Sequence, residues 1–144
     1  MLTDISFHED DRAQRLLDVF PHLEGQINVS YVNSTSHVVA WHRHEIQTDY
    51  WVCLRGSFKV GLAKPRHSVP LHSQPHEDDY DVEWVYLSDK KFQVLEIVPG
   101  IHHGYRAIEP GSVLLYYLTH KYNPDDEWRA KPGDFGETWE TINK

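Results

Sequence analysis

From residue 26 onward the chain is dominated by short segments in which apolar and polar residues alternate. Eight such segments, rich in Val, Ile, Tyr and Trp, span residues 26–32, 37–44, 49–56, 57–63, 82–87, 92–98, 103–108 and 112–119. Polar or glycine-containing breaks separate most of them. Period-two alternation of β-branched and aromatic residues favours strands, and a series of short strands is typical of sandwiches and barrels. The pattern therefore predicts an all-β antiparallel fold.

Three regions depart from this pattern. Near the N-terminus, Leu16, Leu17 and Phe20 have helical spacing before Pro21 breaks the run, which predicts a short N-terminal helical segment. Residues 64–81 contain three prolines and a cluster of acids, as expected of a surface loop. The polar tail after Tyr122 retains three large aromatic residues, so we expect it to pack onto another surface, such as that of a neighbouring subunit; they are Trp128, Phe135 and Trp139.

Length and composition limit the kinds of protein that this chain can be. With 144 residues, of which 40% are hydrophobic, it can bury one core, which predicts a single domain over residues 1–144. A formal net charge of −8 argues against a nucleic-acid partner, because such proteins carry a basic face. Cys53 is the only cysteine, the first ten residues lack a basic start and an apolar core, and no apolar run is long enough to span a bilayer. We therefore expect a cytoplasmic protein without membrane contact.

Two histidines in the segment WHRHE are candidate residues of a functional site. In a strand, residues two apart share a face, so His42 and His44 should point the same way. Downstream, a Pro-Gly turn precedes His103. This order of residues resembles the two motifs of the cupin superfamily, HxH(x)4E(x)6G and PxGxxH, with Asp49 in place of the longer Glu and Gly56 ending the first motif. The resemblance implies a jelly-roll barrel whose interior holds the histidines.

A metal site is one possible use of these residues. Three imidazoles and a carboxylate would suit a divalent transition metal, and the ligand set would be His42, His44, Asp49 and His103. The other possibilities are a proton-transfer site without metal and strand histidines that serve only packing and hydrogen bonding.

Further elements resemble one branch of the cupins, the dTDP-4-dehydrorhamnose 3,5-epimerase family. They occur in the family's order from about residue 10 to residue 127, and they are Asp11-Arg12, Gln26-x-Asn28-x-Ser30, His42, Leu54-Arg55-Gly56, His103-Gly104 and LYYLTHKYNPDDE at 115–127. The family consists of metal-free homodimeric cupins that act on nucleotide-linked 4-keto sugars. The resemblance thus implies a homodimer, a nucleotide-diphosphate sugar as ligand and no cofactor.

The resemblance also implies roles for individual residues. His42 matches the catalytic base and Tyr122 the acid, which suits the chemistry: His can remove a proton next to a ketone, and Tyr can deliver one to the other face. The implied substrate-binding residues are Arg12, Gln26, Asn28, His44, His103 and Tyr116.

Three departures from the family pattern keep other hypotheses open. Asp49 stands where the family has a Lys that supports the enolate, Val39 replaces an Arg, and the chain ends before the region that supplies an Asp to orient the base. We therefore predict an epimerase or isomerase of a dTDP-linked 4-keto-6-deoxy sugar. The alternatives are a metal-dependent cupin enzyme and a sugar-binding cupin without catalytic activity.

Overall fold

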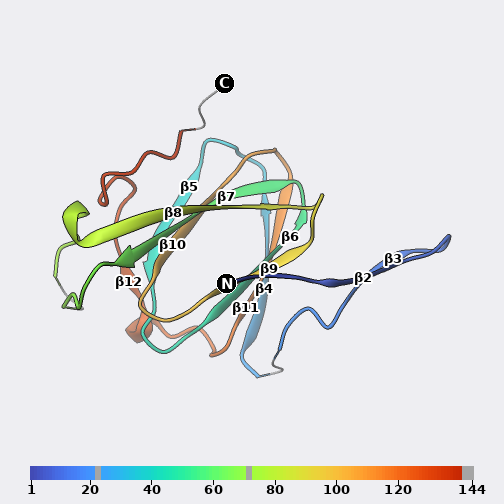
Figure 1. Ribbon diagram of the computed structural model, residues 1–144, viewed down its shortest axis with the longest axis horizontal. Helices are drawn as coiled ribbons and strands as arrows, with labels where there is room; N and C mark the ends of the chain where they lie inside the picture. The colour runs from blue at the N-terminus through green and yellow to red at the C-terminus, as the bar shows by residue number, and fades with distance from the viewer. Residues whose placement is uncertain (22–23, 71–72, 141–144) are drawn as a thin grey trace.

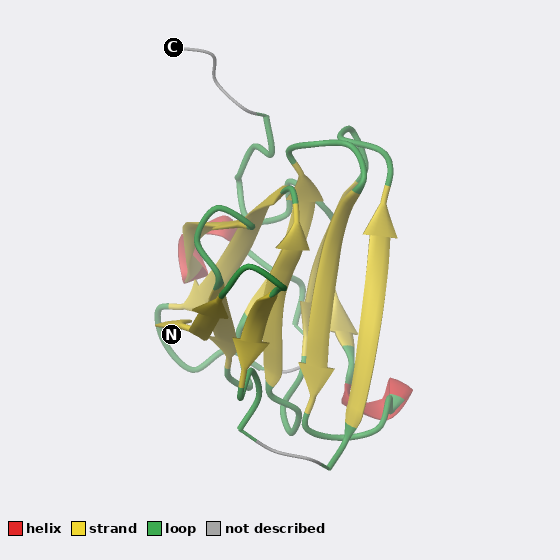
Figure 2. Ribbon diagram, turned by 90° about the vertical axis from the view of Figure 1, so that its right-hand side faces the viewer, coloured by secondary structure: helices red, strands yellow, loops and turns green. Residues whose placement is uncertain are grey.

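Two five-stranded antiparallel sheets packed face to face form the body of the protein (Figures 1 and 2). The computed structural model describes residues 1–21, 24–70 and 73–140. The first sheet has the order β1 (Leu2–Asp4), β9 (Gln93–Ile97), β6 (Asp49–Arg55), β11 (Ser112–Leu118) and β4 (Gln26–Val32). The second has the order β12 (Trp128–Arg129), β5 (Val38–Arg43), β10 (His102–Ala107), β7 (Ser57–Pro65) and β8 (Tyr80–Ser88). The all-β jelly-roll prediction is confirmed, and each of the eight predicted strands is present.

The inner faces of the two sheets share one apolar core. Its largest members include Trp51 from the first sheet and Phe58 from the second, which are 5% and 0% exposed. Burial of a side chain of this size stabilises the fold by roughly 1.5–3 kcal/mol. The alternation of strand residues places these side chains inside, where they hold the sheets at a fixed separation.

The C-terminal tail covers the outer face of the second sheet. The rings of Phe135 and Trp139 lie 5.2 and 5.1 Å from the ring of Trp41, between centroids. Gly61 makes this packing possible, because a Cβ atom there would lie 2.5 Å from the ring of Trp41. Trp128 lies in β12, which pairs with β5. The tail aromatics therefore pack onto the body of their own chain.

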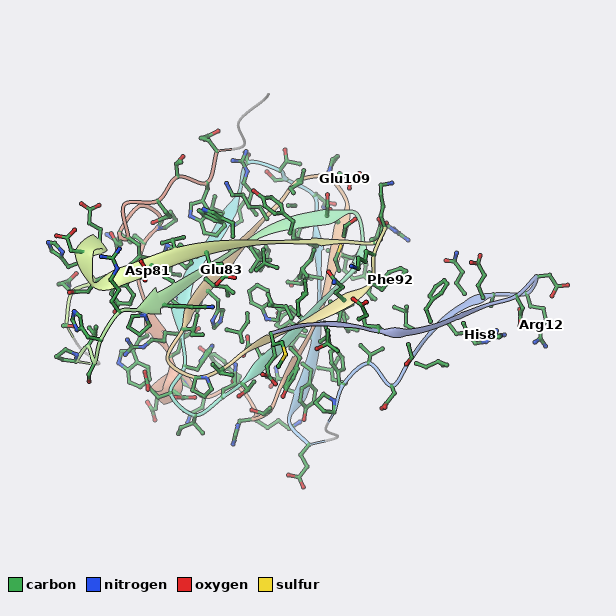
Figure 3. The ribbon with its side chains drawn as sticks, viewed as in Figure 1. His8, Arg12, Asp81, Glu83, Phe92 and Glu109 are labelled. Carbon is green, nitrogen blue, oxygen red and sulfur yellow. The ribbon has the colours of Figure 1, made fainter. Side chains whose placement is uncertain are left out.

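The predicted N-terminal helical segment is wrong. Residues Ser6–Glu9 (β2) and Gln14–Leu17 (β3) form an antiparallel hairpin that projects from the body (Figures 1 and 3). The carboxylate of Asp10 accepts hydrogen bonds from the backbone N–H groups of Arg12 and Ala13, which stabilises the turn. A helix this short is marginal in water without tertiary packing, so three apolar residues at helical spacing are not enough to form one.

Two short 3-10 helices, η1 (Glu77–Asp79) and η2 (Pro124–Asp126), complete the described structure. In η2 the side chain of Asn123 accepts a hydrogen bond from the backbone N–H of Asp125, which caps the turn. Within the described residues, no helix is long and apolar enough to cross a membrane.

Candidate active site

A cavity of about 230 Å³ opens between the two sheets. The residues that line it come from β4, β5, β6, β10, β11 and the segments that follow β5 and β11. They are Asn28, Val39, His42, His44, Gln47, Asp49, Trp51, His103, Gly104, Tyr105, Leu114, Tyr116, Leu118, Tyr122 and Glu127. The three histidines that the sequence singled out are thus gathered at one place.

Strand geometry explains how the histidines meet. His42 and His103 are direct neighbours across the β5–β10 pairing. His44 follows β5 on the same face as His42, whereas Trp41 points outward to the tail. The loop after His44 is held by Asp126, whose carboxylate accepts hydrogen bonds from the backbone N–H groups of residues 45, 46 and 47 at 2.9–3.3 Å.

A carboxylate orients His42. The Nδ1 atom of His42 lies 2.8 Å from Oε1 of Glu127. Arg129 donates to the other oxygen, Oε2, at 3.1 Å. Burial by itself would raise the pKa of Glu127, but the hydrogen bonds with His42 and Arg129 bring the pKa below its ordinary value. An ionised Glu127 therefore accepts the Nδ1 hydrogen of His42, and the Nε2 lone pair is available as a base.

The sequence predicted no role for Glu127, and it identified no carboxylate that would orient His42. Yet Glu127 is the last residue of the 115–127 element that carried the resemblance. The sequence therefore contained Glu127 in a matched element. Its contact with His42, however, depends on how the segment after β11 folds back towards β5.

A second cluster contains His44, Asp49 and His103, all of them buried. The Nε2 atom of His103 lies 3.6 Å from Oδ2 of Asp49, and the two imidazole rings are 5.3 Å apart between centroids. Burial lowers the pKa of His103 to about 4, although the charge of Asp49 opposes this shift. His103 is therefore neutral at pH 7. In the part of the chain that the structure describes, His42 is outside this cluster, so the four-residue ligand set is reduced to three.

Polar residues of the first sheet face the cavity from the opposite side. Asn28 on β4 and Tyr116 on β11 are paired across the two strands, and both line the cavity. Gln26 has another position: its Nε2 donates to Oδ1 of Asn28 at 3.0 Å, and its Oε1 accepts the backbone N–H of Tyr122 at 3.1 Å. Gln26 thus positions Asn28 and the Tyr122 segment.

Of the last two predicted residues, Tyr122 lies at the edge of the site and Arg12 lies outside it. Tyr122 lines the cavity but is 56% exposed, and its hydroxyl lies 3.5 Å from Oε2 of Glu127. Arg12 lies at the tip of the projecting hairpin, where it forms an ion pair with Asp10 at 2.8 Å (Figure 3). Within a single chain, Arg12 is therefore remote from the cavity.

The fold and site together define a cupin-type jelly roll with a histidine–carboxylate pair at its cavity. No family model matches the chain. It is 32% identical over 136 residues to a Haloferax volcanii protein described as "Probable low-salt glycan biosynthesis epimerase", covering 86% of this chain and 81% of that protein. It is also 32% identical over 143 residues to the spore coat polysaccharide biosynthesis protein SpsL of Bacillus subtilis, covering 93% and 90%.

The chain belongs to the RmlC-like family, named for dTDP-4-dehydrorhamnose 3,5-epimerase. Its fold agrees with a solved structure, that of a dTDP sugar isomerase from Desulfovibrio desulfuricans, with a TM-score of 0.78. That alignment covers 96% of this chain and 89% of the other at 20% identity, and it therefore supports the fold alone.

Proposed function

We propose that this protein epimerises or isomerises a nucleotide-linked keto sugar, with a dTDP-linked 4-keto-6-deoxy sugar as the substrate. The observation that carries the proposal is the contact between His42 and Glu127 at the cavity. Membership of the RmlC-like family and similarity to a glycan biosynthesis epimerase support the substrate class.

The first step is removal of a proton from the carbon next to the ketone. The lone pair on Nε2 of His42 takes the proton, the C–H bond breaks, and its electron pair forms an enolate with the charge on the ketone oxygen. Glu127 stabilises the imidazolium that results. Return of a proton from the Tyr122 hydroxyl to the opposite face of the carbon would invert its configuration, and the tyrosine would then regain a proton from solvent. No step changes the oxidation state of the sugar as a whole.

Asn28 and Tyr116 supply hydrogen-bonding groups for the ligand. They approach the cavity from the first sheet, whereas His42 approaches from the second, so a sugar between the sheets would contact both. Gln26 acts through Asn28. His44 and His103 complete the wall beneath the ligand.

A second copy of the chain would complete the site. The outward face of the edge strand β4 is apolar and exposed: Ile27, Val29 and Tyr31 are 60%, 45% and 75% exposed. The projecting hairpin also exposes Phe7 and Leu17. Exposed apolar surface of this kind marks an interface, and a twofold dimer buries the same patch on both copies. We propose a homodimer in which the hairpin lies on the second copy and Arg12 binds the diphosphate there.

In this arrangement Arg12 would balance the negative charge of the ligand. Among the described residues that line the cavity, none is Lys or Arg, although a sugar diphosphate is anionic. Arg12 from a second copy would supply a cation that the cavity lacks. We also propose that residues 1–144 form one domain and that the protein acts in the cytoplasm.

The test is proton exchange in deuterated water with a dTDP-linked 4-keto-6-deoxy sugar. We expect deuterium at C3 or C5, detected by mass spectrometry and NMR, and its loss in His42→Asn. Binding of the sugar without exchange would instead identify a sugar-binding cupin without catalytic activity. Exchange that persists in His42→Asn would assign the base to another residue. Replacement of the exposed His120 by Asn is the matched control and should leave exchange unchanged.

A further inference from the structure

Arg129, in the short strand β12, lies directly opposite His42. The register of β12 on β5 pairs Arg129 with His42 and Trp128 with Arg43. Residues that face each other across two paired strands have side chains on the same side of the sheet. Arg129 therefore lies on the side of His42, whereas Arg43 lies on the other side, 5.7 Å from the centre of the Trp128 ring. Strand pairing thus sets the position of the Arg129 cation relative to the histidine.

The tail of the chain holds β12 in this register. The backbone N–H of Trp41 donates to the carbonyl oxygen of Ala130 at 2.9 Å, and the N–H of Ala130 donates to that of Trp41 at 3.1 Å. The rings of Phe135 and Trp139 pack on the ring of Trp41. A segment near a chain end is poorly ordered unless such contacts tie it down. The backbone that carries Arg129 is therefore fixed to β5.

Arg129 and His42 share the carboxylate of Glu127. Nη2 of Arg129 donates to Oε2 at 3.1 Å, whereas Nδ1 of His42 lies 2.8 Å from Oε1. The hydroxyl of Tyr122 lies 3.5 Å from Oε2 as well. Both of these partners face Oε2, which leaves Oε1 to the imidazole. Arg129 thus opposes rotation of the carboxylate away from His42.

The charge of Arg129 also bears on which nitrogen of His42 carries the hydrogen. The side chain of Glu127 is only 11% exposed, and burial by itself raises its pKa, whereas the hydrogen bonds with His42 and Arg129 lower that pKa. An ionised carboxylate can only accept, which places the hydrogen on Nδ1 and the lone pair on Nε2. A protonated carboxyl would instead donate to Nδ1, and the neutral imidazole would then carry its hydrogen on Nε2. That form could not act as the base.

We propose that Arg129 is a positioning residue for the base: it acts through Glu127 and holds that carboxylate in the charge state and orientation that His42 requires. Among the described residues, Arg129 is outside the lining of the cavity, so this role needs no contact with the sugar. Its effect on turnover rests on the proposed function. Its effect on the imidazole of His42 does not.

The first test is a comparison of Arg129→Gln with Arg129→Lys by NMR. Long-range proton–nitrogen spectra report which imidazole nitrogen carries the hydrogen, and the signal of His42 is assigned by its absence from His42→Asn. We expect hydrogen on Nδ1 in the wild type and a mixture of the two forms in Arg129→Gln. In the described structure a single nitrogen of Arg129 donates to Glu127, and a Lys ammonium can also make one such bond. Arg129→Lys should therefore restore the spectrum of the wild type.

Kinetics with the dTDP-linked 4-keto-6-deoxy sugar give the second test. Arg129→Gln should lower kcat about tenfold with KM unchanged, as expected for the loss of a hydrogen bond to a charged group. Arg66→Gln is the matched control, because Arg66 forms a similar exposed ion pair with Asp81 at 2.9 Å and does not line the cavity. It should leave both kcat and the spectrum of His42 unchanged. The side chain of Arg129 is 68% exposed, so its variants should fold, which circular dichroism verifies.

Three results would overturn the inference: an unchanged His42 spectrum in Arg129→Gln, equal losses in Arg129→Gln and Arg129→Lys, or a rise in KM with unchanged kcat. The last result would make Arg129 a ligand-binding residue. The two measurements also separate this inference from the proposed function. A changed spectrum in Arg129→Gln, with no deuterium exchange in the wild type, would support the inference and overturn the proposed function. Exchange in the wild type, with an unchanged spectrum in Arg129→Gln, would do the reverse.

Discussion

Oε1 of Glu127 lies 2.8 Å from Nδ1 of His42, although 85 residues separate them in the sequence. The contact fixes the tautomer of the imidazole and directs its other nitrogen into the cavity. Glu127, for which the sequence predicted no role, thus orients the base His42.

Replacing Glu127 by Gln should therefore reduce turnover more than binding. The amide keeps the size of the side chain but loses the charge that stabilises the imidazolium, so kcat should fall by roughly 100-fold or more while KM changes little. Steady-state kinetics and the pH profile of kcat check this. Asp125→Asn, which alters an exposed acid of the same segment, is the control. A rise in KM with unchanged kcat would contradict the orienting role.

Asn28→Ala should weaken ligand binding with little change in melting temperature. The substitution removes one cavity-facing hydrogen-bonding group, and the affinity for a dTDP sugar should fall about 3- to 10-fold. Ser30→Ala is a suitable control, since Ser30 lies on the same strand but is not among the described residues that line the cavity. Calorimetric titration gives the affinities. A large melting shift with unchanged affinity would assign Asn28 to the fold.

Asp126→Ala should destabilise the protein. Its buried carboxylate accepts hydrogen bonds from three successive backbone N–H groups, which would lose their partner. We expect a loss of about 2–3 kcal/mol in the free energy of unfolding, measured in urea. A change in stability below about 0.5 kcal/mol, the usual range for surface substitutions, would contradict this assignment.

The buried thiol of Cys53 should make stability fall at high pH. Burial, with the nearby charge of Asp89, raises its pKa to about 12. In the unfolded chain the thiol ionises near pH 8.5, so above that pH only the unfolded state loses the proton, and the free energy of unfolding falls by roughly 1.4 kcal/mol per pH unit. Urea unfolding between pH 8 and 10 should show a smaller decline in Cys53→Ala. Parallel declines in the two proteins would rule out this contribution.

Light scattering should give a mass of twice 16.9 kDa if the exposed face of β4 is the dimer interface. Tyr31→Glu places a charge in that face and should produce a monomer. Tyr86→Glu provides the control, because Tyr86 is 57% exposed on β8 of the other sheet. A wild-type monomer at micromolar concentration, or a dimer that survives Tyr31→Glu, would exclude this interface.

The sequence by itself determined the strands and the direction of their side chains. Period-two alternation placed His42 and His44 on one face and Trp41 on the other, and the structure has this arrangement because successive strand residues point to opposite faces. The N-terminal segment lacks such a pattern, and its three apolar residues at helical spacing do not form a helix. The conformation of this segment is set by the pairing of β2 with β3, which no local sequence pattern predicted.

Only the tertiary structure decided which side chains meet. The link from Glu127 to His42, the exclusion of His42 from the cluster of His44 and His103, and the packing of the tail onto Trp41 all join residues far apart in the sequence. Such contacts depend on the order of strands in the two sheets and on the path of the segment after β11. Alternation along a strand specifies which face a residue occupies, but not which residue lies opposite it, because the strand partner is chosen by packing of the whole domain.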